Sequence, residues 1–63
     1  MEQTTIIRQD KFGNILVSTI QLEDGWYETG VFQGRKFKRL FMTCKEALAD
    51  AMAVHEEQCR IYA

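Results

Sequence analysis

The chain has 63 residues, of which 46% are hydrophobic and 27% charged, with no proline and a formal net charge of -1. A chain of this length forms one domain with a thin core, because folding at this size buries only about 60% of the surface that the unfolded chain exposes. We therefore expect a single domain over residues 1–63, to which a second subunit, a metal or a disulfide could add stability.

The cysteines and the chain start bear on the compartment. Cys44 and Cys59 are too few for the disulfide framework of a small secreted domain, so we expect reduced thiols. The first residues show no basic stretch followed by an apolar run of signal length, and the sequence has no apolar run of about 18 residues. These features predict a cytoplasmic protein with no membrane partner. The pI near 5.7 also argues against binding to nucleic acid through bulk positive charge, so any such role must rest on a local patch.

Glycines divide the first two thirds of the chain. Gly13, Gly25 and Gly34 lie in turn-like contexts between runs rich in β-branched and aromatic residues, which is the hairpin signature. The pattern predicts an antiparallel meander, with short strands near residues 3–9, 15–22, 26–32 and 35–41.

The period changes after the last of these strands. Thr43 is followed three residues later by Glu46, the spacing of a capping box at a helix start. From Cys44 to Tyr62 there is no Gly or Pro, and apolar residues recur at helical spacing along one stripe. The sequence therefore predicts a helix over about 43–62. The fold class is α+β, a three- or four-stranded antiparallel β-meander packed on one C-terminal α-helix.

Turn lengths fix which strand residues share a face of the sheet, because side chains alternate along a strand. Two-residue turns at Asp24-Gly25 and Gln33-Gly34 assign one face to the helix: Ile7, Leu16, Ser18, Ile20, Leu22, Tyr27, Thr29, Val31 and Leu40, with Lys36 and Lys38 at a corner. A bulge near Phe12-Gly13 or Gly34 would exchange the faces of the affected strand.

The second face predicted by this register mixes aromatic residues with arginines, and we expect it to bind a partner. Its candidate binding residues are Arg8, Thr19, Gln21, Trp26, Glu28, Phe32, Arg35, Phe37 and Arg39. Guanidinium groups bind phosphates, aromatic rings stack on bases, and both residue types are enriched at protein interfaces. The partner is therefore DNA, a second copy of the chain, or another protein.

Basic residues concentrate between Arg35 and Lys45, which hold five of the eight in eleven positions. One interpretation is a patch that binds phosphate, which Arg8 could extend. The alternative is an edge strand that its charges protect against aggregation.

Catalytic and metal-binding patterns are sparse. His55 and Cys59 have the spacing of two zinc ligands, but Cys44 lies about 22 Å further along the helix and cannot join them within one subunit. We expect His55 to be buried with one hydrogen bond, and no metal. Cys44, beside Lys45 in the first helical turn, has no histidine within reach to act as a base. We therefore expect a structural Cys44, no enzymatic activity, no cofactor and no small-molecule substrate.

Several segments resemble a known family. Gly25-Trp26-Tyr27 opens a strand, Gln33-Gly34-Arg35-Lys36 forms a turn, and residues 38–47 run from a basic strand into the helix. Over about residues 14–60, this order resembles the small sheet-plus-helix DNA-binding domains at the amino end of tyrosine-family phage and transposon integrases, and plant ethylene-response-factor domains are similar. The resemblance implies DNA contact through the sheet face away from the helix, by Thr19, Gln21, Trp26, Glu28, Arg35, Phe37 and Arg39.

Two functions follow as predictions. The first is a non-catalytic DNA-binding module that uses the sheet face away from the helix. The alternative is a protein-interaction module, either a homodimer through the aromatic face or a small phage-type inhibitor of a host protein.

Overall fold

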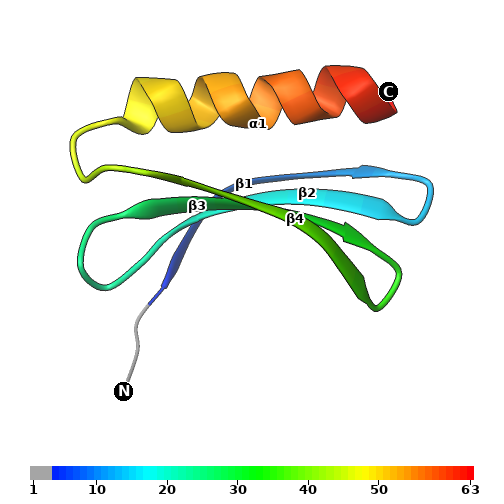
Figure 1. Ribbon diagram of the computed structural model, residues 1–63, viewed down its shortest axis with the longest axis horizontal. Helices are drawn as coiled ribbons and strands as arrows, with labels where there is room; N and C mark the ends of the chain where they lie inside the picture. Colours follow the sequence, from blue (N-terminus) through cyan, green and yellow to red (C-terminus); the bar gives the residue numbers. More distant parts are fainter. Residues whose placement is uncertain (1–3) are drawn as a thin grey trace.

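A computed structural model describes residues 4–63 of the chain. Its four strands form one antiparallel sheet in the order β1-β2-β3-β4, and one C-terminal helix packs on the sheet (Figure 1). The elements are β1 (Thr5–Phe12), β2 (Ile15–Gln21), β3 (Tyr27–Gln33), β4 (Lys36–Thr43) and α1 (Leu48–Tyr62). The predicted α+β meander is confirmed. The predicted start of the first strand, Gln3, lies outside the described residues, and that strand continues to Phe12 because the turn to β2 contains only two residues.

The helix begins at Leu48, so the predicted capping box is wrong. Thr43 is the last residue of β4 and pairs with Tyr27 of β3, while Ala47 stands at the helix N-cap without a side-chain hydrogen bond. The Thr43 hydroxyl is buried and has no hydrogen-bond partner. Sheet pairing therefore extends β4 through the proposed cap, and residues 44–47 make the reversal that places α1 on the sheet.

Five residues separate β2 from β3, and the outer two, Leu22 and Trp26, still pair, so the turn between them contains three residues rather than the two predicted. Leu22 N–H donates to the carbonyl of Trp26 at 2.7 Å, and Gly25 N–H donates to the carbonyl of Leu22 at 2.9 Å. Gly25 has φ +94°, which suits glycine, and the pattern is a type I turn followed by a one-residue bulge. Gln21 consequently pairs with Tyr27. This register turns β2 over relative to the prediction, and Val17 and Thr19, rather than Leu16, Ser18 and Ile20, face the helix.

Two register shifts complete the sheet. One lies between Ile6 and Arg8 of β1, and the other places an extra residue, Lys38, in β4 opposite the step from Val31 to Phe32. Because a bulge reverses the alternation beyond it, Arg39 and Phe41 lie on the helix side of β4. Phe37 stays on the other side, paired with Phe32.

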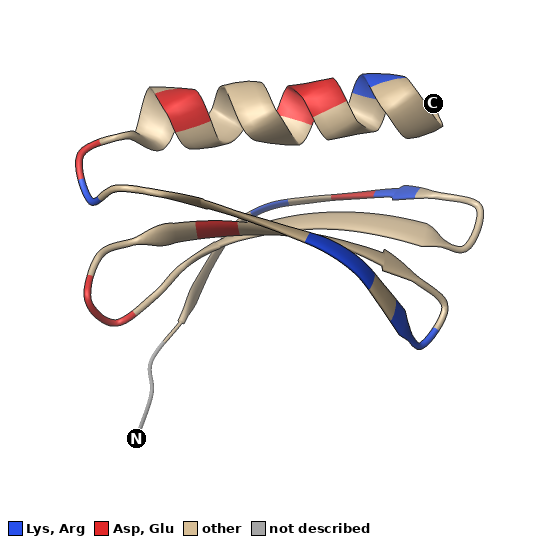
Figure 2. Cartoon of the chain, in the orientation of Figure 1, with Lys and Arg blue, Asp and Glu red and all other residues tan. Residues whose placement is uncertain are grey.

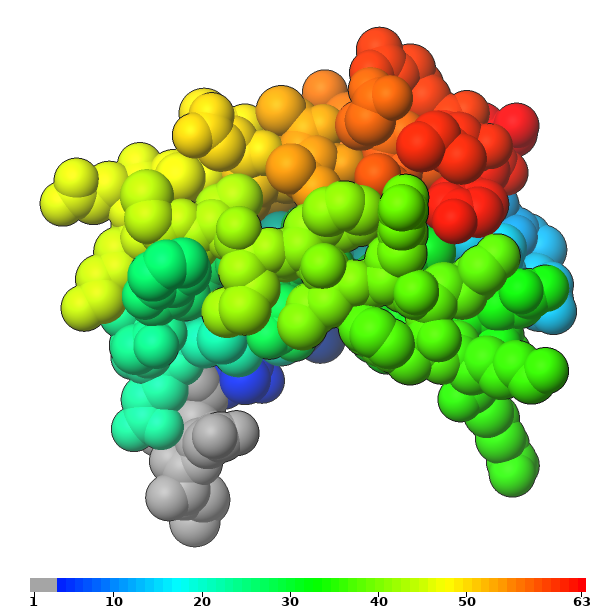
Figure 3. Space-filling view, viewed as in Figure 1, coloured from blue at the N-terminus to red at the C-terminus, as the bar shows by residue number. Residues whose placement is uncertain are grey.

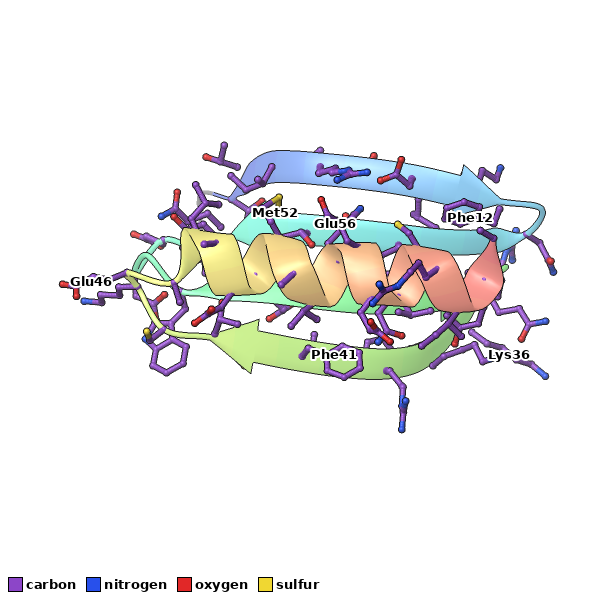
Figure 4. The ribbon with its side chains drawn as sticks, turned by 90° about the horizontal axis from the view of Figure 1, so that it is seen from above. Phe12, Lys36, Phe41, Glu46, Met52 and Glu56 are labelled. Atoms are coloured by element: carbon purple, nitrogen blue, oxygen red, sulfur yellow. The ribbon has the colours of Figure 1, made fainter. Side chains whose placement is uncertain are left out.

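Many of the fully buried side chains between sheet and helix are small or polar. The buried hydrophobic residues are Val17, Tyr27, Val31, Ala47 and Ala51, and the buried polar residues on the same side are Thr19, Thr29, His55 and Gln58. Figure 4, viewed from the helix side, shows α1 above the central strands, with Phe41 on β4 and Phe12 on β1 to either side. Within residues 4–63, α1 is neither long nor apolar enough to cross a membrane.

Candidate functional site

The sheet surface directed away from α1, here named the open face, is predominantly apolar. Strand alternation and the observed pairings give it only Lys11 and Glu28 as charged side chains, with Gln9 and Ser18 as polar ones. Gln9 and Ser18 share a side-chain hydrogen bond of 3.1 Å, which confirms that they point to the same side. The apolar members of the open face are Ile6, Leu16, Ile20, Phe32, Phe37, Leu40 and Met42.

Several of these side chains are strongly exposed. The exposed fractions are 61% for Ile6, 56% for Phe37, 51% for Met42 and 45% for Leu40. The rings of Phe32 and Phe37 meet edge to face, with centroids 5.5 Å apart. A Cβ atom at Gly30 would lie 2.6 Å from the Phe32 ring, so the ring rests on the backbone of β3 where glycine leaves room for it. The open face is therefore an ordered apolar surface.

The structure divides the nine predicted binding residues. Glu28, Phe32 and Phe37 lie on the open face, as expected. The face predicted for four others, Arg8, Thr19, Gln21 and Arg39, is wrong, because the loop length and the bulges place them on the helix side. Thr19 is fully buried there and cannot contact a partner of the folded chain.

The remaining two predicted residues lie at the ends of the strands. Arg35 occupies the β3–β4 turn. Trp26 follows the β2–β3 loop, where its backbone N–H donates to the Asp24 carboxylate at 3.0 Å. The Trp26 side chain lines a hollow of about 310 Å³ together with Cys44, Lys45 and Glu46. The expected continuous surface of arginines and aromatic rings is thus absent from the described residues.

The basic residues of β4 gather near the β3–β4 turn, while acidic residues are found on α1 and in the β2–β3 loop (Figure 2). Lys38 Nζ lies 5.6 Å from the centre of the Tyr62 ring, and the Arg39 guanidinium carbon lies 5.8 Å from the centre of the Phe41 ring. These contacts direct both cations toward the helix side. The edge strand is exposed and charged, as the aggregation-protection interpretation expects.

A second arrangement, which the sequence did not predict, lies between β1 and α1. His55 is fully buried, and its Nε2 donates to Asp10 Oδ2 at 2.7 Å. Its Nδ1 lies 2.8 Å from the Thr19 hydroxyl, which is 2.7 Å from the Thr29 hydroxyl. Cys59 Sγ lies 3.7 Å from the same oxygen of Asp10. The predicted burial of His55 is confirmed, but both of its ring nitrogens, rather than one, are hydrogen-bonded.

The electrostatics of this cluster follow from its contacts. The pKa of Asp10 is lowered from its ordinary value of 3.8, first by the hydrogen bond from His55 and then by the hydrogen bond and charge of Arg8, against an opposing effect of desolvation. The pKa of Cys59 is raised, mainly by desolvation and then by the negative charge of Asp10. Asp10 is therefore an ionised carboxylate at neutral pH, and Cys59 is a protonated thiol.

Asp10 was not predicted as a site residue from the sequence. It lies three residues before Gly13-Asn14, where an acidic residue is typical of a turn. Alternation with Phe12, which packs on the helix side, was the signal that could have placed it in a strand. Comparison with family models, with curated proteins and with solved structures finds no match for this chain.

Proposed function

We propose that the protein is an interaction module that pairs with a second copy of itself through the open face. The observation that carries the proposal is the distribution of large apolar residues. The open face carries seven large apolar side chains and two charged ones. By the same alternation, the helix side of the sheet carries six large apolar side chains together with at least four charged ones: Phe12, Ile15, Val17, Tyr27, Val31 and Phe41, with Arg8, Asp10, Lys36 and Arg39. The sheet therefore presents its more apolar side where no helix covers it.

Covering this face would remove a large unfavourable contact with water. Figure 3 shows α1 and the sheet as two layers in contact, with no further segment of residues 4–63 packed below the sheet. Burial of apolar surface is favourable by about 25 cal/mol per Å², and a contiguous exposed patch of this kind usually marks an interaction site. A small domain with little buried apolar surface gains most from such an interface.

Self-complementarity favours a second copy as the occupant. Twisted antiparallel sheets pack face to face in sandwiches, with their inner side chains interdigitated. The two charges of the open face lie toward opposite ends of the strands, Lys11 near the β1–β2 turn and Glu28 near the β2–β3 loop. A two-fold axis across the strands brings opposite charges of the two copies to the same end of the interface.

Pairing through sheet edges is less favourable than pairing through faces. The β1 edge carries the bulge between Ile6 and Arg8, and the β4 edge carries the bulge at Lys38 together with exposed basic residues. Bulges and lysines on edge strands are features that oppose pairing with another strand. Both edges therefore carry features that oppose pairing with another strand, whereas the open face carries no comparable feature against face-to-face packing.

DNA binding remains a prediction that draws less support from this geometry. Its proposed surface required Arg8, Thr19, Gln21 and Arg39 on the open face, and these residues lie on the other side of the sheet. The basic stretch near the β3–β4 turn is the part of the chain that could still contact phosphates.

The test is a matched pair of variants studied by sedimentation equilibrium. Phe37 on the open face and Ile61 on α1 are both 56% exposed, so serine at either position alters a similar exposed area. We expect the wild type and Ile61→Ser to dimerise at micromolar concentration and Phe37→Ser to dissociate at least tenfold more readily, with circular dichroism unchanged. A wild type that stays monomeric at high micromolar concentration contradicts the proposal. Salt-sensitive retardation of duplex DNA by such a monomer would favour the DNA alternative.

A further inference from the structure

We propose that Asp10, His55 and Cys59 form a zinc-binding site between β1 and α1. The three side chains offer one carboxylate oxygen, one imidazole nitrogen and one sulfur, and these atoms all lie within 4.8 Å of one another. Oxygen, nitrogen and thiolate sulfur are the donors that Zn²⁺ takes in proteins. The proposal is independent of the open face, which lies on the other side of the sheet.

Two of the three donor–donor distances lie close to those of a zinc site, and all three are within 4.8 Å. Zinc bound at about 2.0 Å from nitrogen and oxygen and about 2.3 Å from sulfur separates tetrahedral ligand atoms by about 3.3 to 3.6 Å. His55 Nε2 and Asp10 Oδ2 are 2.7 Å apart, and Cys59 Sγ and Asp10 Oδ2 are 3.7 Å apart. The imidazole is fixed in the core, while the Asp10 side chain is 33% exposed and is free to move outward to widen its distance from Nε2.

The hydrogen bonds behind His55 match those of a metal-bound histidine. A ligating histidine usually donates its second ring N–H to an oxygen, which fixes its tautomer and orientation. Here the Thr19 hydroxyl stands 2.8 Å from Nδ1, and the Thr29 hydroxyl stands behind it. Because each hydroxyl can donate or accept, Thr19 can accept a hydrogen bond from Nδ1–H when Nε2 binds the ion, and can then donate its own proton to Thr29.

Charge and proton balance are also consistent with a divalent cation. The Asp10 carboxylate and the Cys59 thiolate carry two negative charges, which Zn²⁺ neutralises. On binding, the Cys59 thiol releases its proton to solvent. The proton that His55 Nε2 donates to Asp10 in the metal-free protein must also leave that nitrogen, and the neutral ring then carries its single proton on Nδ1. Arg8 Nε lies 2.8 Å from Asp10 Oδ2, and Arg8 Nη1 lies 3.6 Å from Glu56 Oε1. Arg8 therefore keeps a carboxylate partner when Asp10 binds the ion.

The position of the site explains what the ion would do for the fold. Asp10 belongs to β1, an outer strand of the sheet, whereas His55 and Cys59 belong to α1. Figure 4 shows Glu56 on the β1 side of α1, which is where the helix reaches toward that strand. The ion would join β1 to α1. A water molecule at the exposed side of Asp10 would supply the fourth ligand.

The experiment titrates the reduced, metal-free full-length protein with Zn²⁺ by calorimetry and with Co²⁺ by absorption spectroscopy. We expect one ion per chain, a thiolate-to-cobalt charge-transfer band and a higher melting temperature with zinc. Cys59→Ser should remove the band and weaken Zn²⁺ binding at least tenfold, whereas the matched variant Cys44→Ser, which alters the exposed cysteine outside the cluster, should bind as the wild type does.

Asp10→Asn provides a second variant that keeps the shape of the side chain and should also weaken binding at least tenfold. Wild-type and Cys59→Ser proteins that bind Zn²⁺ equally, or a loss of binding in Cys44→Ser, would overturn the proposal. Sedimentation of the metal-free protein tests the proposed dimer separately, because dimerisation through the open face does not require zinc.

Discussion

The two sides of the sheet contrast in an unexpected direction. The side under α1 holds a hydrogen-bonded chain from Thr29 through Thr19 and His55 to Asp10, between large apolar side chains such as Val17 and Val31. The open face carries Phe32, Phe37 and five aliphatic or methionine side chains. The side under α1 therefore combines apolar packing with buried polar hydrogen bonds, while the open face leaves most of its apolar side chains exposed.

The contrast teaches that hydrophobicity alone does not decide which side of a two-faced sheet a helix covers. Leu16 and Ile20 are more apolar than Thr19, yet they point away from α1. The one-residue lengthening of the β2–β3 loop places Thr19 opposite His55 instead, where each satisfies the other in a water-poor environment.

The largest expected effect comes from removing the centre of the covered side. His55→Ala should lower the free energy of unfolding by about 3 kcal/mol, because it leaves a cavity and deprives Thr19 and Asp10 of a partner. Leu40→Ala on the open face, where the side chain is 45% exposed, should cost less than about 1 kcal/mol. Urea denaturation of the monomer, at concentrations below those at which the protein dimerises, measures both. Equal losses would erase the distinction between the sides.

A smaller effect should appear in acid. Because the pKa of Asp10 is lowered on folding, the folded chain binds fewer protons than the unfolded chain as the pH falls toward and below 3.8. The contribution of Asp10 is therefore complete well above pH 3.8 and is lost as the pH drops through the folded-state pKa. Urea titrations from pH 6 to pH 2 should show less acid destabilisation in Asp10→Asn than in the wild type. An identical pH profile would contradict the role given to the His55 hydrogen bond.

The smallest effect concerns the end of β4. Thr43→Val should change the free energy of unfolding by less than about 0.5 kcal/mol, or raise it slightly, because the buried hydroxyl has no hydrogen-bond partner and valine suits a strand. If Thr43 capped the helix, the same substitution would cost about 1 kcal/mol. Thermal unfolding followed by circular dichroism distinguishes the two results.

Much of the fold was predictable because its signals are local. Glycine-containing turns separated by β-branched and aromatic runs located all four strands, and the alanine-rich stretch without Gly or Pro located the helix. The helix start was not predictable in this way. Thr43 and Glu46 satisfy the local pattern of a capping box, but pairing of β4 with β3, a contact between distant residues, takes Thr43 into the sheet.

The candidate surface was predicted only in part, for a related reason. Asp24-Gly25 fits both a two-residue hairpin turn and the three-residue turn with a bulge, and the two differ by one residue of register. Glu28 and Phe32 escaped this ambiguity because the faces of β3 were assigned correctly, and Phe37 pairs with Phe32 between the turn and the bulge of β4. The contact between His55 and Asp10 could not be predicted, because it depends on which side of β1 faces the helix, and the sequence does not settle this.

The three-residue loop at Gly25 also limits how this chain can vary. Deletion of one loop residue would favour a register in which the side chains of β2, and with them those of β1, exchange faces. Leu16 and Ile20 would then lie under α1, and Thr19 would point away from it. Removal or addition of two residues would keep the alternation intact. Tolerance to insertions and deletions at this loop should therefore alternate between odd and even lengths, although the loop itself is exposed and short.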